Sequence, residues 1–353
     1  IAQCLVGSEM CIRDRCRRDA FMQQEQIQWE ANVWYLERLH LGKHRIDESK
    51  SLISISFMEV KEIQNREILQ AYMKYELGIT GQAVSTIVRR FVCIRNFIEL
   101  LEQEKILAIH ATVAEVKKYA DGLRERGIQA KGFNERIFGI GHFYKFMEVK
   151  QYITRMPFRI EYFQQKEVVV HHDRSVEETV YMEILKKLYL FPERLRCMFL
   201  HLWCLGLRAS EVCTLKGNAY YQQGEDYWIQ VYQVKMKNYK RIPIPQALYQ
   251  IMKVYLKKHE IQPEEFIFKN NRGGACLYGT FRTQMIEACR ENKIANGEYL
   301  FQSHDYRHTV ATMFYDSHVS LQSIRDYLGH TYEEMTRQYI DLSLIHISEP
   351  TRH

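Results

Sequence analysis

The chain has 353 residues, of which 46% are hydrophobic, and a formal net charge of +6. A chain of this length usually divides into two domains with separate cores, and its basic balance favours a polyanionic partner without requiring one. No apolar run approaches the roughly 18 residues of a membrane span, so we expect a cytoplasmic protein with no membrane partner.

Both ends of the sequence look foreign to the rest of it. Residues 1–15 and 342–353 resemble translations of the two strands of one transposase-type sequencing adapter, because one short DNA encodes the first segment on one strand and the second on the other. We expect both segments to be artefacts outside the fold, and we expect the natural protein to continue past Asp341.

Residues 16–62 form an N-terminal extension with two predicted elements. The run 27–36 predicts a helix, and the alternation of residues 51–57 predicts a short strand. An arm that contacts DNA or a neighbouring subunit and an extension that packs on the next domain both remain open.

Residues 63–153 have the pattern of a small helical domain. One apolar stripe steps by four, three, four and three through Ile87, Phe91, Ile94, Ile98 and Leu101. Further helices are predicted near 113–126 and 134–147. Four cations off the apolar faces are candidate DNA-phosphate contacts, although such charges are as often merely solvated: Arg89, Arg90, Lys131 and Arg136.

Residues 154–172 are broken by proline and lack periodicity, which predicts a linker. Neighbours in sequence point apart in a strand or helix, so His171 and His172 predict no metal site. The nine cysteines have no C-x-x-C spacing, so neither a zinc site nor a disulfide framework is indicated. We expect no metal and no cofactor.

Residues 173–341 predict a mixed α/β domain. Its first helix is expected to begin with a capping box at Ser175 to Glu178. β-branched and aromatic runs at 226–234 and 241–244 predict a hairpin. Helices are predicted near 175–190, 192–204, 209–215, 246–258, 278–291, 305–316, 321–328 and 332–340.

Cations gather in this last domain. Arg208 follows a helix that ends at Gly206, and Glu211, one turn on, is placed to hold its guanidinium. His304 and Arg307 are three residues apart, which puts them on one helix face, with Ser303 as a predicted N-cap. An arginine fork holds two oxygens of a phosphodiester transition state, so two arginines take the place of a metal ion.

Three further residues complete a phosphodiester-cleaving set. His330 follows the helix stop at Gly329, and Tyr339 lies nine residues beyond that histidine. A tyrosine ionises near pH 10, so its attack needs a base, for which His304 is the candidate, while His330 donates to a phosphate oxygen. Lys235 in the hairpin is the candidate proton donor to the departing oxygen. Lys237 is its rival and is also a candidate DNA contact.

Each residue taken singly also has an ordinary explanation. Arg208 with Glu211 is often a surface ion pair, a Gly-His at a helix end is often a C-cap, and Tyr339 is one of 23 tyrosines. Their joint order and spacing favours the functional interpretation.

This series resembles the tyrosine recombinases, also called phage-type integrases. Their hallmark is an Arg, a hairpin Lys, a His-x-x-Arg, a Gly-His and a Tyr nine residues later. The matching positions are Arg208, Lys235, His304, Arg307, His330 and Tyr339. The resemblance is strong from 173 to 341 and extends to 65–150 only in helix pattern.

The resemblance implies a mainly α fold with a small β-hairpin, in which a helical core-binding (SAM-like) domain and a catalytic integrase domain close on DNA as a clamp. It implies a site-specific recombinase that cuts and rejoins double-stranded DNA through a 3′-phosphotyrosyl link without metal or ATP. A homotetramer on two DNA sites and DNA-bending accessory proteins are further expectations.

The N-terminal extension favours a mobile-element integrase. The alternatives are a Xer-like resolvase of chromosome or plasmid dimers, a type IB topoisomerase, a DNA-binding protein with a decayed site, and a metal-dependent histidine hydrolase.

Overall fold

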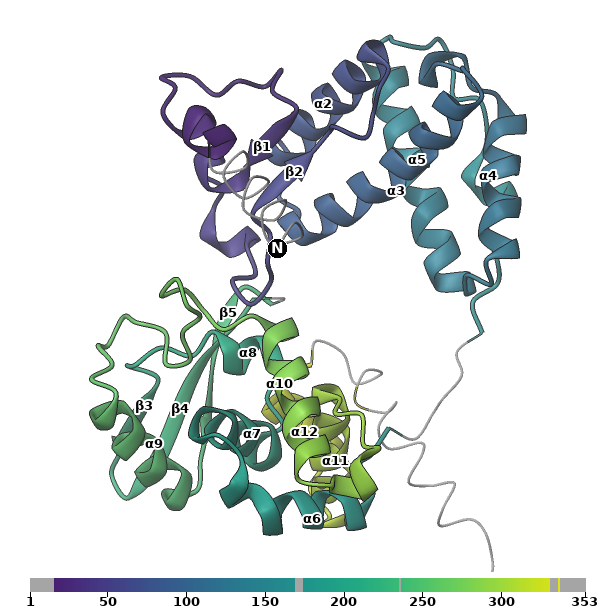
Figure 1. The fold of residues 1–353 in the computed structure, drawn as a ribbon. Coiled ribbons are helices and arrows are strands. Elements are labelled where there is room, and N and C mark those ends of the chain that lie inside the picture. Colours follow the sequence, from purple (N-terminus) through teal and green to yellow (C-terminus); the bar gives the residue numbers. More distant parts are fainter. Residues whose placement is uncertain (1–15, 169–173, 235, 331–335, 337–353) are drawn as a thin grey trace, which may run out of the picture. The chain divides into compact units, whose positions relative to one another are not determined.

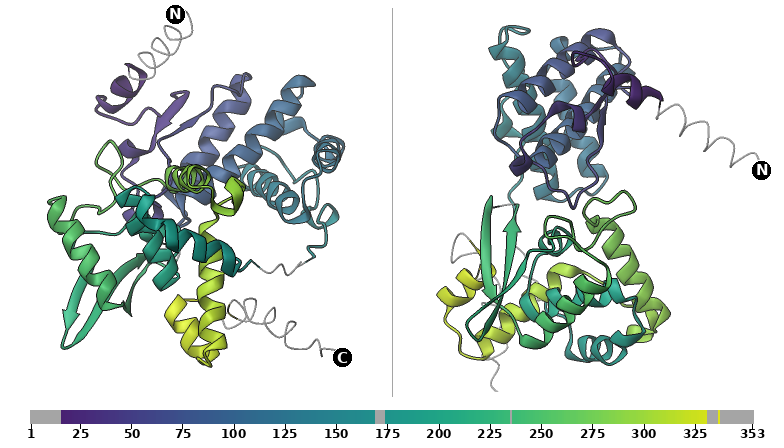
Figure 2. Two further views of the ribbon diagram at one scale, coloured as in Figure 1. Left: turned by 60° about the horizontal axis from the view of Figure 1, so that its bottom comes forward. Right: turned by 90° about the vertical axis from the view of Figure 1, so that its left-hand side faces the viewer.

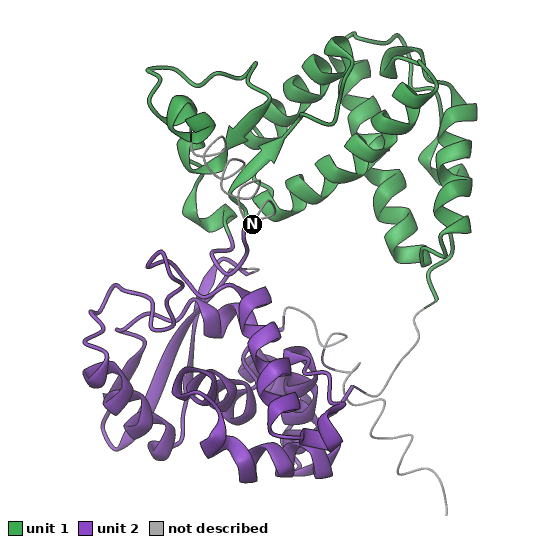
Figure 3. Ribbon diagram, viewed as in Figure 1, with its two compact units in different colours: residues 1–46, 52–169 green, residues 47–51, 170–353 purple. Residues whose placement is uncertain are grey.

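The computed structural model describes residues 16–168, 174–234, 236–330 and 336, which fall into two compact units (Figure 3). Within this described part, unit 1 holds residues 16–46 and 52–168, and unit 2 holds residues 47–51 and those from 174 onward. No helix in these residues is both long enough and apolar enough to cross a membrane.

Four long helices make up most of the described part of unit 1, after a short helical stretch at residues 16–22 (Figure 1). They are α2 (Ile63–Gly78), α3 (Val84–Gln103), α4 (Val113–Glu125) and α5 (Ala130–Val149). The predicted apolar stripe on α3 is confirmed, because all five of its residues are buried in the core of this unit. Short 3-10 turns at Ala108–His110 and Ile160–Tyr162 flank the last two helices.

The N-terminal segment contributes a two-stranded sheet to unit 1. Strand β1 (Val33–Tyr35) pairs antiparallel with β2 (Ser54–Ser56), so the predicted strand is confirmed and the predicted helix at 27–36 is wrong. Trp34 is fully buried, with its ring 4.7 Å from that of Phe57. Tertiary packing of this β-prone aromatic residue therefore overrides the weak helical period. Turns Leu36–Leu39 and Lys43–Arg45 follow β1.

Unit 2 is arranged around one central helix, α7 (Glu193–Leu205), which packs against four other helices (Figures 1 and 2). These are α8 (Ala209–Cys213), α9 (Gln246–Lys258), α10 (Tyr278–Glu291) and α11 (Ser303–Asp316). The other helical elements are α6 (Glu178–Lys187), α12 (Leu321–Leu328) and 3-10 turns at Leu188–Leu190 and Ile294–Gly297.

A three-stranded antiparallel sheet covers one side of unit 2 in the order β3-β4-β5. The strands are β3 (Tyr220–Gln223), β4 (Asp226–Gln233) and β5 (Asn238–Pro243). The predicted hairpin is confirmed as β4 and β5, whereas β3 was not predicted. Residues Ile229, Val231 and Gln233 of β4 are buried, as are Lys240 and Ile242 of β5, so they form one inward row.

The predicted fold class is confirmed, since the molecule is mainly helical with two small sheets. Two predicted helix starts are wrong. Helix α6 begins only at Glu178 with no side-chain cap, and α11 begins at Ser303 itself after an uncapped Gln302. Ser303 is buried as the first residue of the helix, so it does not serve as the N-cap. The helix predicted at 332–340 lies outside the described residues apart from Thr336.

Candidate active site

Arg208 stands at the corner between two helices, as predicted. Helix α7 ends at Leu205, and Gly206 takes the left-handed conformation with φ of 57°. A Cβ on Gly206 would lie 3.2 Å from a methyl of Val310, so both the turn and the close packing require glycine. Arg208 then precedes the first residue of α8 and keeps its side chain 20% exposed.

Glu211 organises this corner. Its Oε2 accepts the backbone N–H of Arg208 at 2.8 Å, and its Oε1 accepts from the Arg208 guanidinium and from Gln233 Nε2, each at 2.9 Å. Burial alone raises the pKa of Glu211, but the charges of Arg307 and Arg208 outweigh it and hold the pKa below its ordinary value. The carboxylate is therefore ionised at neutral pH and fixes the direction of Arg208.

Arg307 ties the ends of two helices to a third helix. Its guanidinium donates to the carbonyl of Gly206 at 2.8 Å and to the carbonyl of Leu328, and its residue is only 1% exposed. One of these carbonyls closes α7 and the other closes α12, while Arg307 itself lies on α11. The fold therefore sets a second arginine beside the first in a largely desolvated place.

His330 follows the end of α12 and is neutral at neutral pH. Burial lowers its pKa to about 3, with Arg307 and Arg208 acting in the same direction. Its Nδ1 lies 3.1 Å from the hydroxyl of Thr336. In the tautomer that accepts this hydroxyl, Nε2 carries the proton and is a hydrogen-bond donor, as a phosphate-binding role requires.

His304 lies in the first turn of α11 and is exposed. Its ring is 4.9 Å from that of His308 at 90°. The charge of His304 is one of the causes that lower the pKa of His330, so the two histidines interact across the cluster. An accessible imidazole at this edge is suited to exchange a proton with a group that approaches from solvent.

Unit 2 thus brings together Arg208, Glu211, His304, Arg307 and His330. Two other predicted residues, Lys235 and Tyr339, lie outside the described residues. Lys237, the rival of Lys235, is exposed in the β4–β5 turn with φ of 55°.

Sequence reasoning missed two residues of this cluster, Gln233 and Lys240. Gln233 bonds Glu211, and Lys240 acts electrostatically on both Glu211 and His330. A signal was available for Lys240. It lies two residues before Ile242 and four before Ile244, and alternate residues of a strand point to the same face. Lys240 is therefore expected on the apolar face of its strand.

The four candidate DNA-phosphate contacts of unit 1 differ in their surroundings. Arg89 is 62% exposed beside Glu135 at 3.4 Å, and Lys131 is exposed. Arg136 donates to the Gly132 carbonyl at 2.7 Å. The guanidinium of Arg90 is mostly buried and bonds Glu76 and Gln82 at 3.0 Å each.

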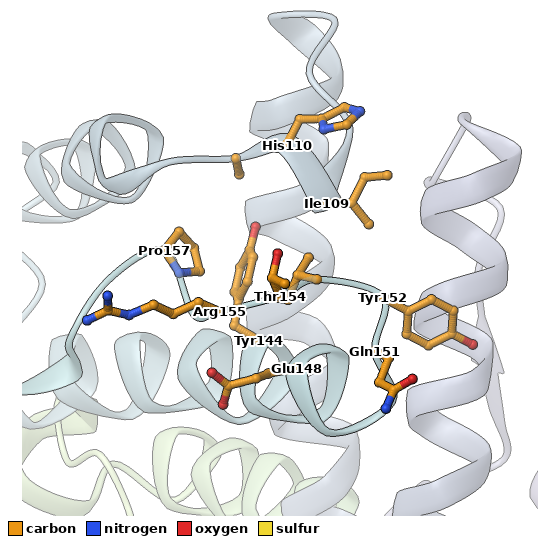
Figure 4. A pocket seen from close by; sticks show the side chains of 11 residues that line it. Ile109, His110, Tyr144, Glu148, Gln151, Tyr152, Thr154, Arg155 and Pro157 are labelled. Atoms are coloured by element: carbon orange, nitrogen blue, oxygen red, sulfur yellow. The ribbon is translucent and has the colours of Figure 1, made fainter.

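A cavity of about 770 Å³ lies in unit 1 beside the carboxyl end of α5 (Figure 4). The Glu148 carboxylate at its floor bonds Lys145 at 2.6 Å and the backbone N–H of Met156 at 3.2 Å. This cavity contains none of the predicted site residues.

Residues 174–344 match the model of the phage integrase family. Transposase B from transposon Tn554 of Staphylococcus aureus strain Mu50 is 25% identical over 322 residues, which are 88% of this chain and 51% of that protein. The chain therefore spans about half the length of this relative. Tyrosine recombinase XerC of Bacillus licheniformis is 23% identical over 298 residues, 80% of this chain and 90% of that protein.

Solved structures share the fold. XerH site-specific recombinase bound to difH substrate has a TM-score of 0.57 and 14% identity, covering 84% of this chain and 92% of that chain. The Tn1549 transposon integrase in complex with a circular intermediate DNA has a TM-score of 0.56 and 15% identity, covering 79% of this chain and 98% of that chain.

The fold and the family match give unit 2 the architecture of an integrase-type domain. Residues 174–344 belong to the phage integrase family, and the chain as a whole is similar to proteins named tyrosine recombinases.

Proposed function

We propose that this chain is a site-specific DNA recombinase that cuts and rejoins double-stranded DNA for a mobile element. The observation that carries the proposal is the pair Arg208 and Arg307, held by Glu211 and by two helix-end carbonyls around one desolvated place. Two preorganised guanidinium groups stabilise the charge that develops on a phosphodiester under attack.

In the proposed mechanism, the Tyr339 oxygen attacks the scissile phosphorus, and the bond from phosphorus to the 5′ oxygen breaks. The phenolic proton passes to His304, and Lys235, with Lys237 as its rival, gives a proton to the departing 5′ oxygen. The phosphotyrosyl ester conserves the energy of the original bond, so the reaction uses neither ATP nor a metal. A second 5′ hydroxyl reverses the step on the partner strand.

His330 assists this step by hydrogen bonding. It is neutral in the unliganded protein, with a pKa of about 3 caused by burial. A bound phosphate adds negative charge beside the ring and thereby raises this pKa, which strengthens any hydrogen bond from Nε2 to a phosphate oxygen.

The mobile-element role is supported by two similar proteins. One is a transposase of transposon Tn554, and the other is the Tn1549 transposon integrase in a complex with circular intermediate DNA. A homotetramer on two DNA sites, with DNA-bending accessory proteins, belongs to the same proposal. Exposed Arg89 and Lys131 and the partly buried Arg136 are the proposed phosphate contacts of the helical domain.

A second candidate function is resolution of chromosome or plasmid dimers. The lengths of the alignments favour this role. The XerC relative aligns with this chain over 90% of its own length, and the Tn554 transposase over only 51%. Recombination between two copies of the element's end sequences, tested against recombination between two copies of a chromosomal dimer-resolution site, separates the two roles.

The test of the cleavage step is covalent trapping on a nicked suicide duplex taken from the DNA that flanks the gene. The wild type is expected to form an adduct that survives denaturant in the presence of a chelator. Tyr339→Phe is expected to bind the duplex without forming the adduct. Tyr239→Phe, which alters a tyrosine that is 66% exposed in the hairpin, is the matched control and keeps the adduct. An adduct in Tyr339→Phe overturns the assignment.

A further inference from the structure

Lys240 occupies a place in β5 that the strand pattern reserves for an apolar side chain. It lies opposite Val231 in the inward row, and its neighbour in that row, Ile242, is 2% exposed. Lys240 itself is only 8% exposed. Burying a lysine among apolar side chains costs desolvation free energy, so we look for a role of Lys240 other than folding.

The surroundings of this lysine are charged but offer it no hydrogen bond. Nζ is buried and has no hydrogen-bond partner among the described residues, and it lies 5.1 Å from the centre of the Tyr327 ring. The charged groups that act on it are Glu211 and Arg208 of the α8 corner and Arg307 of α11. His330 in turn feels the charge of Lys240.

These groups carry an imbalance of charge. Protonated Lys240 makes three cations with the two arginines, against the single carboxylate of Glu211. Burial lowers the pKa of Lys240 to about 7, with Glu211 opposing this shift and the two arginines adding to it. What the cluster lacks is an anion, and a DNA phosphate between the arginines supplies one.

We propose that Lys240 is a proton-gated electrostatic residue, which takes up a proton when a DNA phosphate binds beside Arg208 and Arg307 and adds its charge to theirs. Because its Nζ is buried, Lys240 acts through charge and does not touch the reacting atoms. This role differs from that of the proton donor, which must reach the departing 5′ oxygen. The proposal rests on the proposed function.

The first test compares Lys240→Met with the wild type in the rate of adduct formation on the nicked flanking duplex, from pH 6 to pH 10. The ratio of the two rates cancels the titrating groups that do not interact with Lys240. We expect a deficit of roughly tenfold for Lys240→Met at low pH, smaller than the loss of a direct transition-state donor. The deficit closes as rising pH removes the proton from wild-type Lys240. Lys240→Arg, which stays charged, keeps its rate advantage over Lys240→Met across the whole range.

The matched control is Lys253→Met. Lys253 also lies over a tyrosine ring, with Nζ 5.3 Å from the centre of Tyr249, but it is exposed on α9 and is not among the charged groups that act on Lys240. Its ratio to the wild type is expected to stay near one at every pH.

Folding stability separates this role from a structural one. Methionine suits the apolar row beside Val231 and Ile242, so Lys240→Met is expected to melt at or above the wild-type temperature. A lysine retained for folding would give a lower melting temperature instead.

Proton uptake gives a reading that does not depend on cleavage. Calorimetry of duplex binding at pH 8 in buffers of different ionisation enthalpy is expected to show more proton uptake by the wild type than by Lys240→Met. If the wild type binds DNA but forms no adduct, the proposed cleavage fails while this comparison still decides the role of Lys240. If the wild type binds no DNA, both proposals fall.

Two results overturn the role of Lys240. One is a rate ratio near one at every pH together with equal proton uptake. The other is rescue of Lys240→Met by a substrate with sulfur in place of the 5′ bridging oxygen, because a thiolate leaves without a proton and rescue would make Lys240 the proton donor.

Discussion

Glu211 receives two hydrogen bonds from Arg208, one from its backbone N–H at 2.8 Å and one from its guanidinium at 2.9 Å. Because this carboxylate bonds both the backbone and the side chain of Arg208, it fixes the orientation of the guanidinium as well as its position. The same oxygen that accepts the guanidinium also accepts Gln233, so the sheet and the α7–α8 corner meet at one buried charge.

Glu211→Gln is expected to slow cleavage by about ten- to a hundredfold, because charge-assisted hydrogen bonds are worth about 1.5–3 kcal/mol each. Single-turnover adduct formation measures the effect. Glu264→Gln is the control, since Glu264 pairs with Lys216 at 3.2 Å on the surface, where such pairs contribute little. Equal losses in both variants would contradict the organising role of Glu211.

Arg307→Ala is expected to reduce the cleavage rate about a hundredfold or more, as the loss of a transition-state donor does. It also leaves the carbonyls of Gly206 and Leu328 without this donor, so the melting temperature should fall too. Arg290→Ala, at an exposed position of α10, is the control. Near-normal turnover in a folded Arg307→Ala protein would remove this arginine from the mechanism.

Gly329→Ala is expected to destabilise unit 2 by more than the roughly 1–2 kcal/mol of left-handed strain alone. A Cβ there would lie 2.7 Å from the amide of Gln233, next to the bond that Gln233 makes to Glu211. Gly224→Ala is the matched control, because Gly224 has φ of 63° and open space around its Cβ position. Denaturant unfolding and adduct formation should both separate the two variants, and identical behaviour would argue against the Gln233 contact.

Unit 2 is expected to lose stability as the pH falls below about 6.5. Burial lowers the pKa of His201 to about 4 and that of His330 to about 3. The unfolded chain therefore binds more protons than the folded one between those values and 6.5, and the stabilisation present above 6.5 is lost as acid is added. Thermal unfolding at several pH values checks this, and His201→Gln should flatten part of the slope. A melting temperature unchanged from pH 7 to pH 4 would refute it.

Arg89→Gln and Lys131→Gln are each expected to weaken duplex binding. Each should also reduce the slope of log K against log salt concentration by about one, which corresponds to one lost phosphate contact. Arg90→Gln is expected to act on folding instead, because it breaks a mostly buried pair with Glu76 at 3.0 Å, a loss of about 3–5 kcal/mol. Salt titrations of binding and thermal melts distinguish the two effects. A reduced salt slope with unchanged stability in Arg90→Gln would reverse this assignment.

Apart from two helix starts, the amino-acid sequence by itself determined the described helices of unit 2, the hairpin and the corner at Arg208. These features follow from local rules: apolar residues recur at helical spacing, and glycine after a helix permits the left-handed turn at Gly206. The order and spacing of six residues along the chain predicted the family: Arg208, Lys235, His304, Arg307, His330 and Tyr339.

Only the tertiary structure decided which groups share a charge environment. Local pattern predicted a helix where Trp34 instead pairs in a strand, because packing against Phe57 outweighs propensity. It likewise could not tell that Arg90 is turned inward to Glu76, or that Lys240 lies buried beside Glu211 and the two arginines. Burial and the distances between residues far apart in sequence set the protonation of such groups, and those quantities exist only once the chain is folded.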